Sequence, residues 1–69
     1  MPDVSPVDIN TATAEELTGL PGIGEVLAGR IVEYRTEHGL FASVEDLQNV
    51  SGIAEKKLAD LEGYITIGN

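Results

Sequence analysis

Residues 17–25 read LTGLPGIGE, and this stretch decides the fold. Pro21 biases the residue before it away from the helical region, so a short helix should end there. Gly22 tolerates a positive φ, and neither it nor Gly24 carries a side chain that would obstruct a tight turn. Glu25 then suits the positive end of a new helix dipole. The stretch predicts a helix, a tight hairpin and a second helix, with free backbone N–H groups at the start of the second helix.

The pattern occurs again thirty residues later, without a gap, at residues 47–55, which read LQNVSGIAE. The match extends on both sides, so that Thr13 falls on Ser43 and Tyr34 falls on Tyr64. A fixed-period match across a whole supersecondary unit is a stronger signal than any single motif within it. Each unit is too short to bury its own apolar face. The two copies should therefore pack on each other as a pseudo-twofold pair.

Composition limits the functions that the chain can have. Its 69 residues allow one domain with a small core, and it has no cysteine. No apolar run approaches the roughly 20 residues of a membrane span, so we expect no membrane contact by this domain. Twelve acidic residues face four basic ones, for a net charge of −8. Proteins that bind phosphate backbone usually carry a basic patch, so this balance predicts only weak non-specific attraction to nucleic acid.

The remaining elements follow from capping patterns and periodicity. We expect a disordered leader without a signal peptide at residues 1–6, and a single domain at residues 7–67. The domain divides into a first unit at about 13–38 and a second unit at about 43–65. Helices are predicted at about 14–19, 25–37, 43–48 and 54–62.

Three smaller features complete the expected fold. Thr13 with Glu16, and Ser43 with Asp46, have the spacing of capping boxes. Gly39 is predicted to be a left-handed cap at the end of the second helix. The alternating residues 65–67 are predicted to pair with residues 7–9.

These motifs, in this order, resemble the tandem helix–hairpin–helix domain of the ComEA-type competence DNA receptors. The resemblance covers roughly residues 7–67 and rests on VDINTA at 7–12, LPGIG at 20–24, IVEYR at 31–35 and VEDL at 44–47. It implies an all-α, SAM-like fold, a compact four- to five-helix domain of two pseudo-twofold-related units. It also implies non-catalytic, sequence-independent binding of double-stranded DNA in competence DNA uptake, without a cofactor. If the chain comes from such a receptor, the resemblance implies an extracytoplasmic domain excised from a membrane-anchored full-length protein; the sequence alone does not decide this.

The first hairpin (residues 20–24) and the second hairpin (residues 50–54) are the candidate binding site. Backbone N–H groups at a helix start form an anion site that needs no side chain. By resemblance, the hairpins sit across the minor groove and contact phosphates of both strands without reading bases. The alternative is that Gly-Ile-Gly only makes a tight corner with Ile23 in the core. The predicted phosphate-binding residues are Gly22, Ile23, Gly24, Val26, Leu27, Gly52, Ile53, Ala54, Lys56 and Lys57.

Several residues depart from the family pattern. Leu27 stands where many relatives carry a basic or small polar residue. In the second hairpin an alanine stands where glycine is usual, and its methyl group should crowd an approaching phosphate. Glu25 and Glu55 should repel a phosphate, although both suit the helix dipole. Lys56 and Lys57 make the second hairpin the better binder electrostatically.

The resemblance also implies a monovalent cation, because some DNA-bound hairpins of this superfamily hold one through backbone carbonyls. A hard cation prefers such oxygen ligands. No ion is expected without the DNA phosphate that would complete its coordination shell. The matching carbonyls are those of Thr18, Leu20, Ile23, Gln48, Val50 and Ile53.

The other polar residues suggest structural roles. Arg30 and Arg35 are expected to form local ion pairs with Glu33 or Glu37. His38 suits a helix C-terminus as a cation, and no cysteine or second histidine exists to complete a zinc site. No nucleophile has a convincing base partner, so we do not expect an enzyme.

Two other functions stay open beside DNA binding. The chain could be an acidic protein–protein interaction or structural module that has lost DNA binding, with another protein as its partner. It could also be part of an enzyme whose chemistry lies in other domains. Basic residues at the hairpins favour DNA, whereas a continuous acidic surface over them favours the interaction module.

Overall fold

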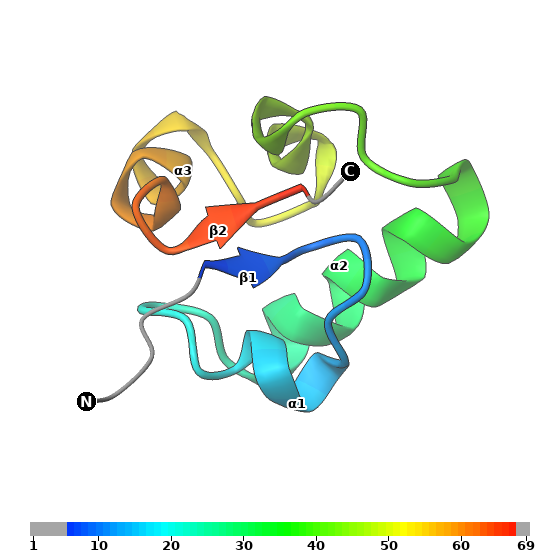
Figure 1. The fold of residues 1–69 in the computed structure, drawn as a ribbon, viewed down its shortest axis with the longest axis horizontal. Coiled ribbons are helices and arrows are strands. Elements are labelled where there is room, and N and C mark those ends of the chain that lie inside the picture. The colour runs from blue at the N-terminus through cyan, green and yellow to red at the C-terminus, as the bar shows by residue number, and fades with distance from the viewer. Residues whose placement is uncertain (1–5, 68–69) are drawn as a thin grey trace.

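The computed structural model describes residues 6–67, and its ribbon shows two helical units with a short strand pair between them in the view of Figure 1. The predicted helix, hairpin and helix are present in both units. A small two-stranded sheet is present as well, so the fold is not purely α. Residues 1–5 of the expected leader lie outside the described residues. The elements in chain order are β1 (Val7–Asp8), α1 (Ala14–Leu17), α2 (Glu25–His38), the 3₁₀ helix η1 (Val44–Asn49), α3 (Glu55–Leu61) and β2 (Ile65–Thr66).

Helix α1 begins at the predicted capping box. The Thr13 Oγ1 accepts from the Glu16 backbone N–H at 3.1 Å, and the Glu16 Oε1 accepts from the Thr13 N–H at 2.9 Å. The helix ends at Leu17, two residues earlier than predicted. The next amides turn back to carbonyls three residues earlier, with Gly19 N donating to Glu16 O and Leu20 N donating to Leu17 O. This tightening of the chain leads into the first hairpin.

The third helix differs in type from the prediction. Residues 44–49 form a 3₁₀ helix, and the Ser43 side chain makes no capping hydrogen bond. The Asp46 Oδ2 instead accepts from the backbone N–H of Ala42 at 3.0 Å, which ties the carboxylate to the preceding linker. The predicted Ser43–Asp46 capping box is therefore wrong, and the segment takes the tighter 3₁₀ form, in which the Asp46 N–H donates to the Ser43 carbonyl at 3.1 Å.

Helix α2 ends at His38 with Gly39 as its cap, as predicted, but the backbone conformation of Gly39 differs from the prediction. Gly39 has φ 93° and ψ 176°, and its N–H donates to the Arg35 carbonyl at 3.1 Å. The φ is positive and favours glycine, whereas a left-handed cap would have ψ near +47°. The chain therefore leaves the helix in an extended direction toward Phe41.

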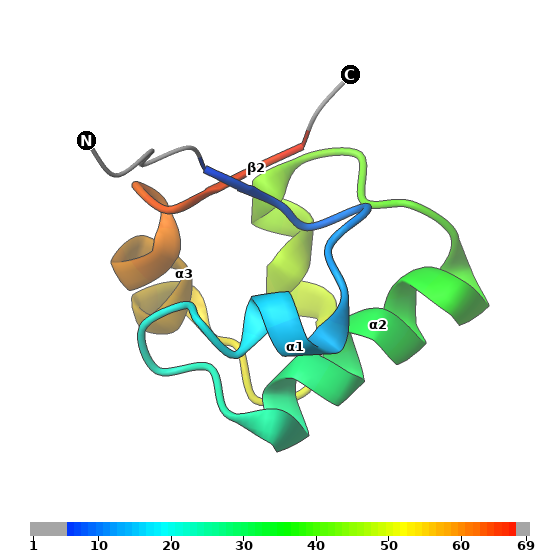
Figure 2. The ribbon, with the colours of Figure 1, turned by 60° about the horizontal axis from the view of Figure 1, so that its bottom comes forward.

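The first and last segments of the described residues pair as predicted. Strands β1 and β2 are parallel, with Val7 opposite Ile65 and Asp8 opposite Thr66. Val7 N donates to the Tyr64 carbonyl at 2.8 Å, and Ile9 N donates to the Thr66 carbonyl at 3.0 Å. Figure 2 shows the strand pair along one side of the molecule with the helices on the other. The pair joins the beginning of the first unit to the end of the second.

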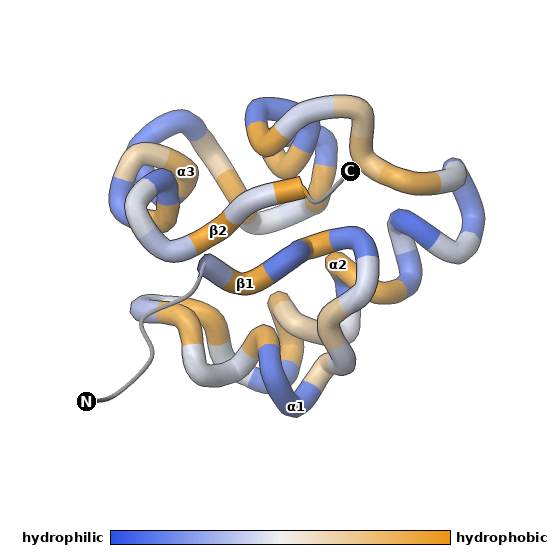
Figure 3. The backbone as a smooth tube through the Cα atoms, in the orientation of Figure 1, coloured by the Kyte–Doolittle hydropathy of each residue, from blue (hydrophilic) through white to orange (hydrophobic). Residues whose placement is uncertain are grey.

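The two units share one hydrophobic core. Figure 3 shows hydrophobic residues spread along both units and both strands. Residues 21–30 and 51–60 have the same burial at every position, which is what a pseudo-twofold pair requires. Within residues 6–67, no helix combines the length and the hydrophobicity that crossing a bilayer would demand. The core side chains are Ile9, Ala12, Leu17, Leu20, Ile23, Ala28, Ile31, Phe41, Leu47, Val50, Ile53, Leu58, Leu61 and Ile65.

Candidate nucleic-acid interface

The two hairpins have the same backbone geometry. Gly22 has φ +77° and Gly52 has φ +98°, so both occupy the region that favours glycine, as predicted. The residue two positions after each of these glycines is a glycine in the first hairpin and an alanine in the second, but its backbone conformation is the same in both. Gly24 has φ −95° and ψ −172°, and Ala54 has φ −101° and ψ −178°. Because this extended backbone suits any residue, the alanine of the second hairpin causes no strain.

The isoleucine at the centre of each hairpin is buried, and its amide makes a hydrogen bond within the turn. Ile23 is 4% exposed and Ile53 is 3% exposed. The Ile23 N–H donates to the Leu20 carbonyl at 3.1 Å, and the Ile53 N–H donates to the Val50 carbonyl at 3.0 Å. Both amides are therefore committed to the turn. The other eight predicted residues remain candidates for phosphate contact, whereas the two isoleucines hold the turns in place.

Free backbone donors lie at the start of both second helices. The first helical hydrogen bond of α2 runs from Ala28 N to Gly24 O, and that of α3 runs from Leu58 N to Ala54 O, each at 2.9 Å. The amides that precede Ala28 and Leu58 in the first turn have no carbonyl partner inside their helix. Residues 24–26 and 54–56 are exposed to solvent. Each hairpin thus presents N–H groups at the positive end of a helix dipole.

Each hairpin is held by a basic side chain from the other unit. The Lys57 Nζ donates to the Gly22 carbonyl at 3.3 Å, and the Arg30 Nη1 donates to the Ser51 carbonyl at 3.1 Å. Lys57 therefore places its charge on the first hairpin rather than on the second, which corrects the expectation from sequence. The Arg35 Nη1 likewise donates to the Ile9 carbonyl at 2.8 Å. Where the sequence predicted ion pairs of the two arginines with Glu33 or Glu37, the structure shows each guanidinium group donating to a distant backbone carbonyl.

The positive-φ glycines leave room for these cross-unit contacts. A Cβ on Gly22 would lie 3.0 Å from the Lys57 Nζ, and a Cβ on Gly52 would lie 2.7 Å from the Leu27 Cδ2. Leu27 and Lys57 are equivalent positions in the thirty-residue repeat. The same position of each second helix therefore packs over the hairpin of the other unit. A leucine does so on one side and a lysine on the other.

The carbonyls predicted to hold a cation are partly engaged already. The Leu20 and Val50 carbonyls accept the turn hydrogen bonds from the two isoleucine amides. A carbonyl oxygen has a second lone pair, so this bond leaves room for one more partner. Among residues 6–67, no three histidine, aspartate or glutamate side chains gather as a metal site would need. The cation at these carbonyls stays a prediction.

One structural residue escaped the sequence analysis. Asn10 bonds twice to the linker between the units: its Nδ2 donates to the Phe41 carbonyl at 3.0 Å, and its Oδ1 accepts from the Phe41 N–H at 2.7 Å. The Phe41 ring stacks on Tyr34, with centroids 5.0 Å apart, and Tyr34 stacks in turn on His38 at 4.5 Å. The sequence signal was an asparagine in an isolated turn. Its partner lies 31 residues away, where no local pattern points to it.

Comparisons with known proteins agree with this geometry. The family model of the helix–hairpin–helix motif matches residues 3–66. The chain is 48% identical over 61 residues to ComE operon protein 1 of Bacillus subtilis, covering 88% of this chain and 30% of that protein. It is 46% identical over 63 residues to the human endonuclease/exonuclease/phosphatase family domain-containing protein 1, covering 91% of this chain and 11% of that protein. The chain therefore spans less than a third of either relative.

Proposed function

The chain belongs to the helix–hairpin–helix family, and on that premise we propose that it binds the phosphate backbone of double-stranded DNA. The proposed contacts are the backbone amides of the two hairpins and of the helix turns that follow them. The binding is non-catalytic and independent of base sequence. The likeness to ComE operon protein 1 supports a place in competence DNA uptake for the protein that carries this domain.

The observation that carries the proposal is the doubled hairpin. Gly22 and Gly52 share a positive φ, and the amides after Gly24 and Ala54 are left without helical partners in both units. Backbone N–H groups at a helix start bind phosphate oxygens without needing a positively charged side chain. A chain with a net charge of −8 can therefore still contact DNA at these two points.

The cross-unit contacts support the proposal by fixing the hairpins relative to each other. Lys57 bonds to the first hairpin and Arg30 bonds to the second, so each hairpin is tied to the other unit. A fixed spacing lets one duplex contact both hairpins without a further ordering cost on binding. The same two side chains bring a positive charge to each hairpin.

Sequence independence follows from the side chains at the hairpins. Val26 is 67% exposed and apolar, and Leu27 packs over Gly52, so neither offers the paired donors and acceptors that read a base edge. Contacts to phosphate position a protein on the duplex but carry no sequence information. We therefore expect two duplexes of unrelated sequence to bind equally well.

The test is a fluorescence-anisotropy titration of fluorescein-labelled duplexes at low salt. Two 20-base-pair duplexes of equal length and different sequence should give the same weak affinity. A marked preference for one sequence would overturn the sequence-independent part. No binding to either duplex at high micromolar concentration would overturn the proposal itself.

A second candidate function, the protein-interaction module, is favoured by one observation. An open hollow with acidic residues beside it lies next to the first hairpin, between α1 and the start of α2.

A further inference from the structure

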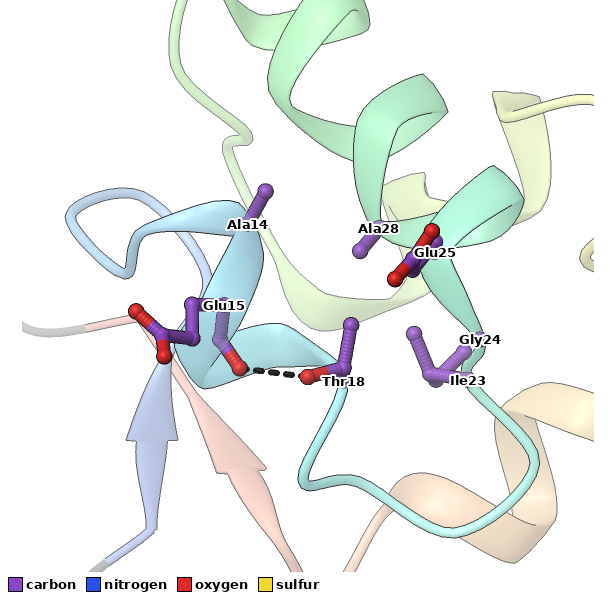
Figure 4. A pocket seen from close by; sticks show the side chains of 7 residues that line it. All are labelled: Ala14, Glu15, Thr18, Ile23, Gly24, Glu25 and Ala28. Atoms are coloured by element: carbon purple, nitrogen blue, oxygen red, sulfur yellow. Dashed lines mark hydrogen bonds between the residues drawn. The ribbon is translucent and has the colours of Figure 1, made fainter.

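The two hairpins share a backbone geometry but differ in a side chain that follows them. Val26 is the second residue of α2 and is 67% exposed. The thirty-residue repeat places Lys56 at the same position of α3, where it is exposed as well. Figure 4 shows the entry into α2, with Ile23 and Gly24 in the hairpin and Glu25 in the first helical turn. The first hairpin therefore presents a branched apolar side chain where the second presents an ammonium group.

Packing inside the domain does not account for the valine. Within residues 6–67, Val26 belongs neither to the core nor to the partly buried hydrophobic residues that pack against it. Its neighbour Leu27, in contrast, packs over Gly52. An exposed apolar residue is common in itself, but β-branched residues lose side-chain freedom in a helix, so the helix does not favour a valine here either. Of the exposed large hydrophobic residues Val26, Leu40 and Tyr64, only Val26 lies in the first turn of a helix that follows a hairpin.

The backbone amide of Val26 determines what its side chain can reach. The first hydrogen bond of α2 runs from Ala28 N to Gly24 O, so the Val26 N–H has no carbonyl partner inside the helix. In the proposed DNA complex this amide donates to a phosphate oxygen, at about 2.9 Å. The Cβ is two bonds from the amide nitrogen, and a sugar is attached to the same phosphorus through its ester oxygen. The valine methyl groups and that sugar therefore lie within van der Waals reach of each other.

We propose that Val26 packs against the deoxyribose of the nucleotide held by the first hairpin and thereby selects DNA over RNA. The inference rests on the proposed DNA binding and names the class of nucleic acid that this hairpin accepts. Carbon 2′ of deoxyribose carries only hydrogen, so the sugar offers an apolar surface that a valine covers. In RNA the 2′-hydroxyl is both a donor and an acceptor, and methyl groups packed against it leave it without a partner.

The basic side chains at the hairpins do not share this role. Lys57 donates to the Gly22 carbonyl at 3.3 Å, and Arg30 donates to the Ser51 carbonyl at 3.1 Å. These groups and the Lys56 ammonium act on a nucleic acid through charge, and RNA and DNA carry the same phosphate groups. They add affinity for either nucleic acid, whereas Val26 discriminates between the two.

The test is a set of fluorescence-anisotropy titrations at low salt with two labelled 20-base-pair duplexes of one sequence, one of DNA and one of RNA. Val26→Thr keeps the branched side chain but replaces a methyl group with a hydroxyl. The parent should bind the DNA more tightly. The variant should lower the ratio of the two affinities about fourfold, which corresponds to the loss of one buried methylene-sized contact. The difference in groove shape between the duplexes acts on both proteins and cancels from this comparison.

Lys56→Gln is the matched control at the equivalent position of the second unit. It should weaken binding to both duplexes by the same factor and leave their ratio unchanged, because it removes a contact to phosphate alone. Both substituted side chains are exposed, so both variants should melt like the parent. An unchanged ratio in Val26→Thr, or an equal change of ratio in Lys56→Gln, would overturn the inference.

Methyl NMR of the parent tests the contact itself. Unlabelled duplex DNA should shift the Val26 methyl signals and leave those of Leu40 in place, since Leu40 is 70% exposed but lies beyond the other end of α2. If DNA binds without shifting the Val26 methyl signals, or if the parent binds RNA as tightly as DNA, the inference fails and DNA binding stands. If the parent binds neither duplex at high micromolar concentration, the proposed DNA binding fails and the inference fails with it.

Discussion

The Lys57 ammonium nitrogen lies 3.3 Å from the Gly22 carbonyl oxygen, across the boundary between the two units. Its repeat equivalent, Leu27, packs over Gly52 on the other side. Each hairpin is therefore stabilised by the second helix of the other unit as well as by its own turn. This arrangement couples the stability of the fold to the geometry of the proposed DNA surface.

Valine at Gly22 or at Gly52 should destabilise the domain. A β-branched residue resists a φ of +77° or +98°, and such backbone strain costs roughly 1–3 kcal/mol. The measurement is thermal unfolding followed by circular dichroism. Gly24→Ala is the matched control, since its φ is −95° and a Cβ there meets no atom within 4 Å. Valine variants that melt like the parent would contradict the role of the positive φ.

Alanine at Gly29 should have the opposite effect. Gly29 lies inside α2, is exposed, and has no atom within 4 Å of the position that a Cβ would take. Replacing glycine by alanine in a helix interior stabilises by roughly 0.5–1 kcal/mol. Chemical denaturation should show a higher midpoint for Gly29→Ala with an unchanged slope. A lower midpoint would mean that the flexibility of α2 at this position is needed for packing.

Asn10→Ala should destabilise the domain by roughly 1–3 kcal/mol, because it leaves two half-buried backbone groups of Phe41 without partners. Urea denaturation measures the loss. Asn10→Asp is the informative second variant: a carboxylate keeps the acceptor for the Phe41 N–H but loses the donor, so its loss should be intermediate. An Asn10→Ala variant as stable as the parent would show that water replaces both hydrogen bonds.

The parts of the fold that follow local rules could be predicted from the sequence. The capping box at Thr13, the positive φ at Gly22 and Gly52, and the pairing of residues 7–9 with residues 65–67 were all predicted and are present. These features depend on residue type and short spacing, or on the repeat. The pattern also predicted a third α-helix, but the Asp46 side chain bonds to the linker and the segment is 3₁₀.

The contacts that join the two units could not be predicted. The partners of Arg30, Arg35 and Lys57 are backbone carbonyls 21, 26 and 35 residues away. The short spacing in the sequence favoured ion pairs with neighbouring glutamates, but an ion pair at an exposed surface adds little to the stability of a fold. Within the candidate site, the positions of both hairpins could be predicted from the sequence. It did not show that the amides of Ile23 and Ile53 are used inside the turns.

DNA binding should depend on salt only shallowly. Few basic side chains lie near the hairpins, so about two to three phosphates would be neutralised, and the log–log slope of affinity against salt should be about −2 to −3. Replacing Lys56 and Lys57 together with glutamate should abolish measurable binding in the same anisotropy assay. A slope of about −6 or steeper would require more basic contacts than the two hairpins offer, and would contradict binding mainly through neutral amides.

The most direct test of the central claim removes the acidic residues that begin the two helices after the hairpins. Glu25 and Glu55 are exposed and follow Gly24 and Ala54 directly, so changing both to lysine removes repulsion at both proposed phosphate sites and adds attraction. The matched control, Glu37→Lys with Glu62→Lys, makes the same change in net charge at two exposed positions, one in the last turn of α2 and one directly after α3. In an anisotropy titration of a labelled duplex at low salt, the first double variant should bind clearly more tightly than both the parent and the control. Equal gains in the two double variants, or no binding by any of the three proteins at high micromolar concentration, would contradict phosphate binding at the hairpins.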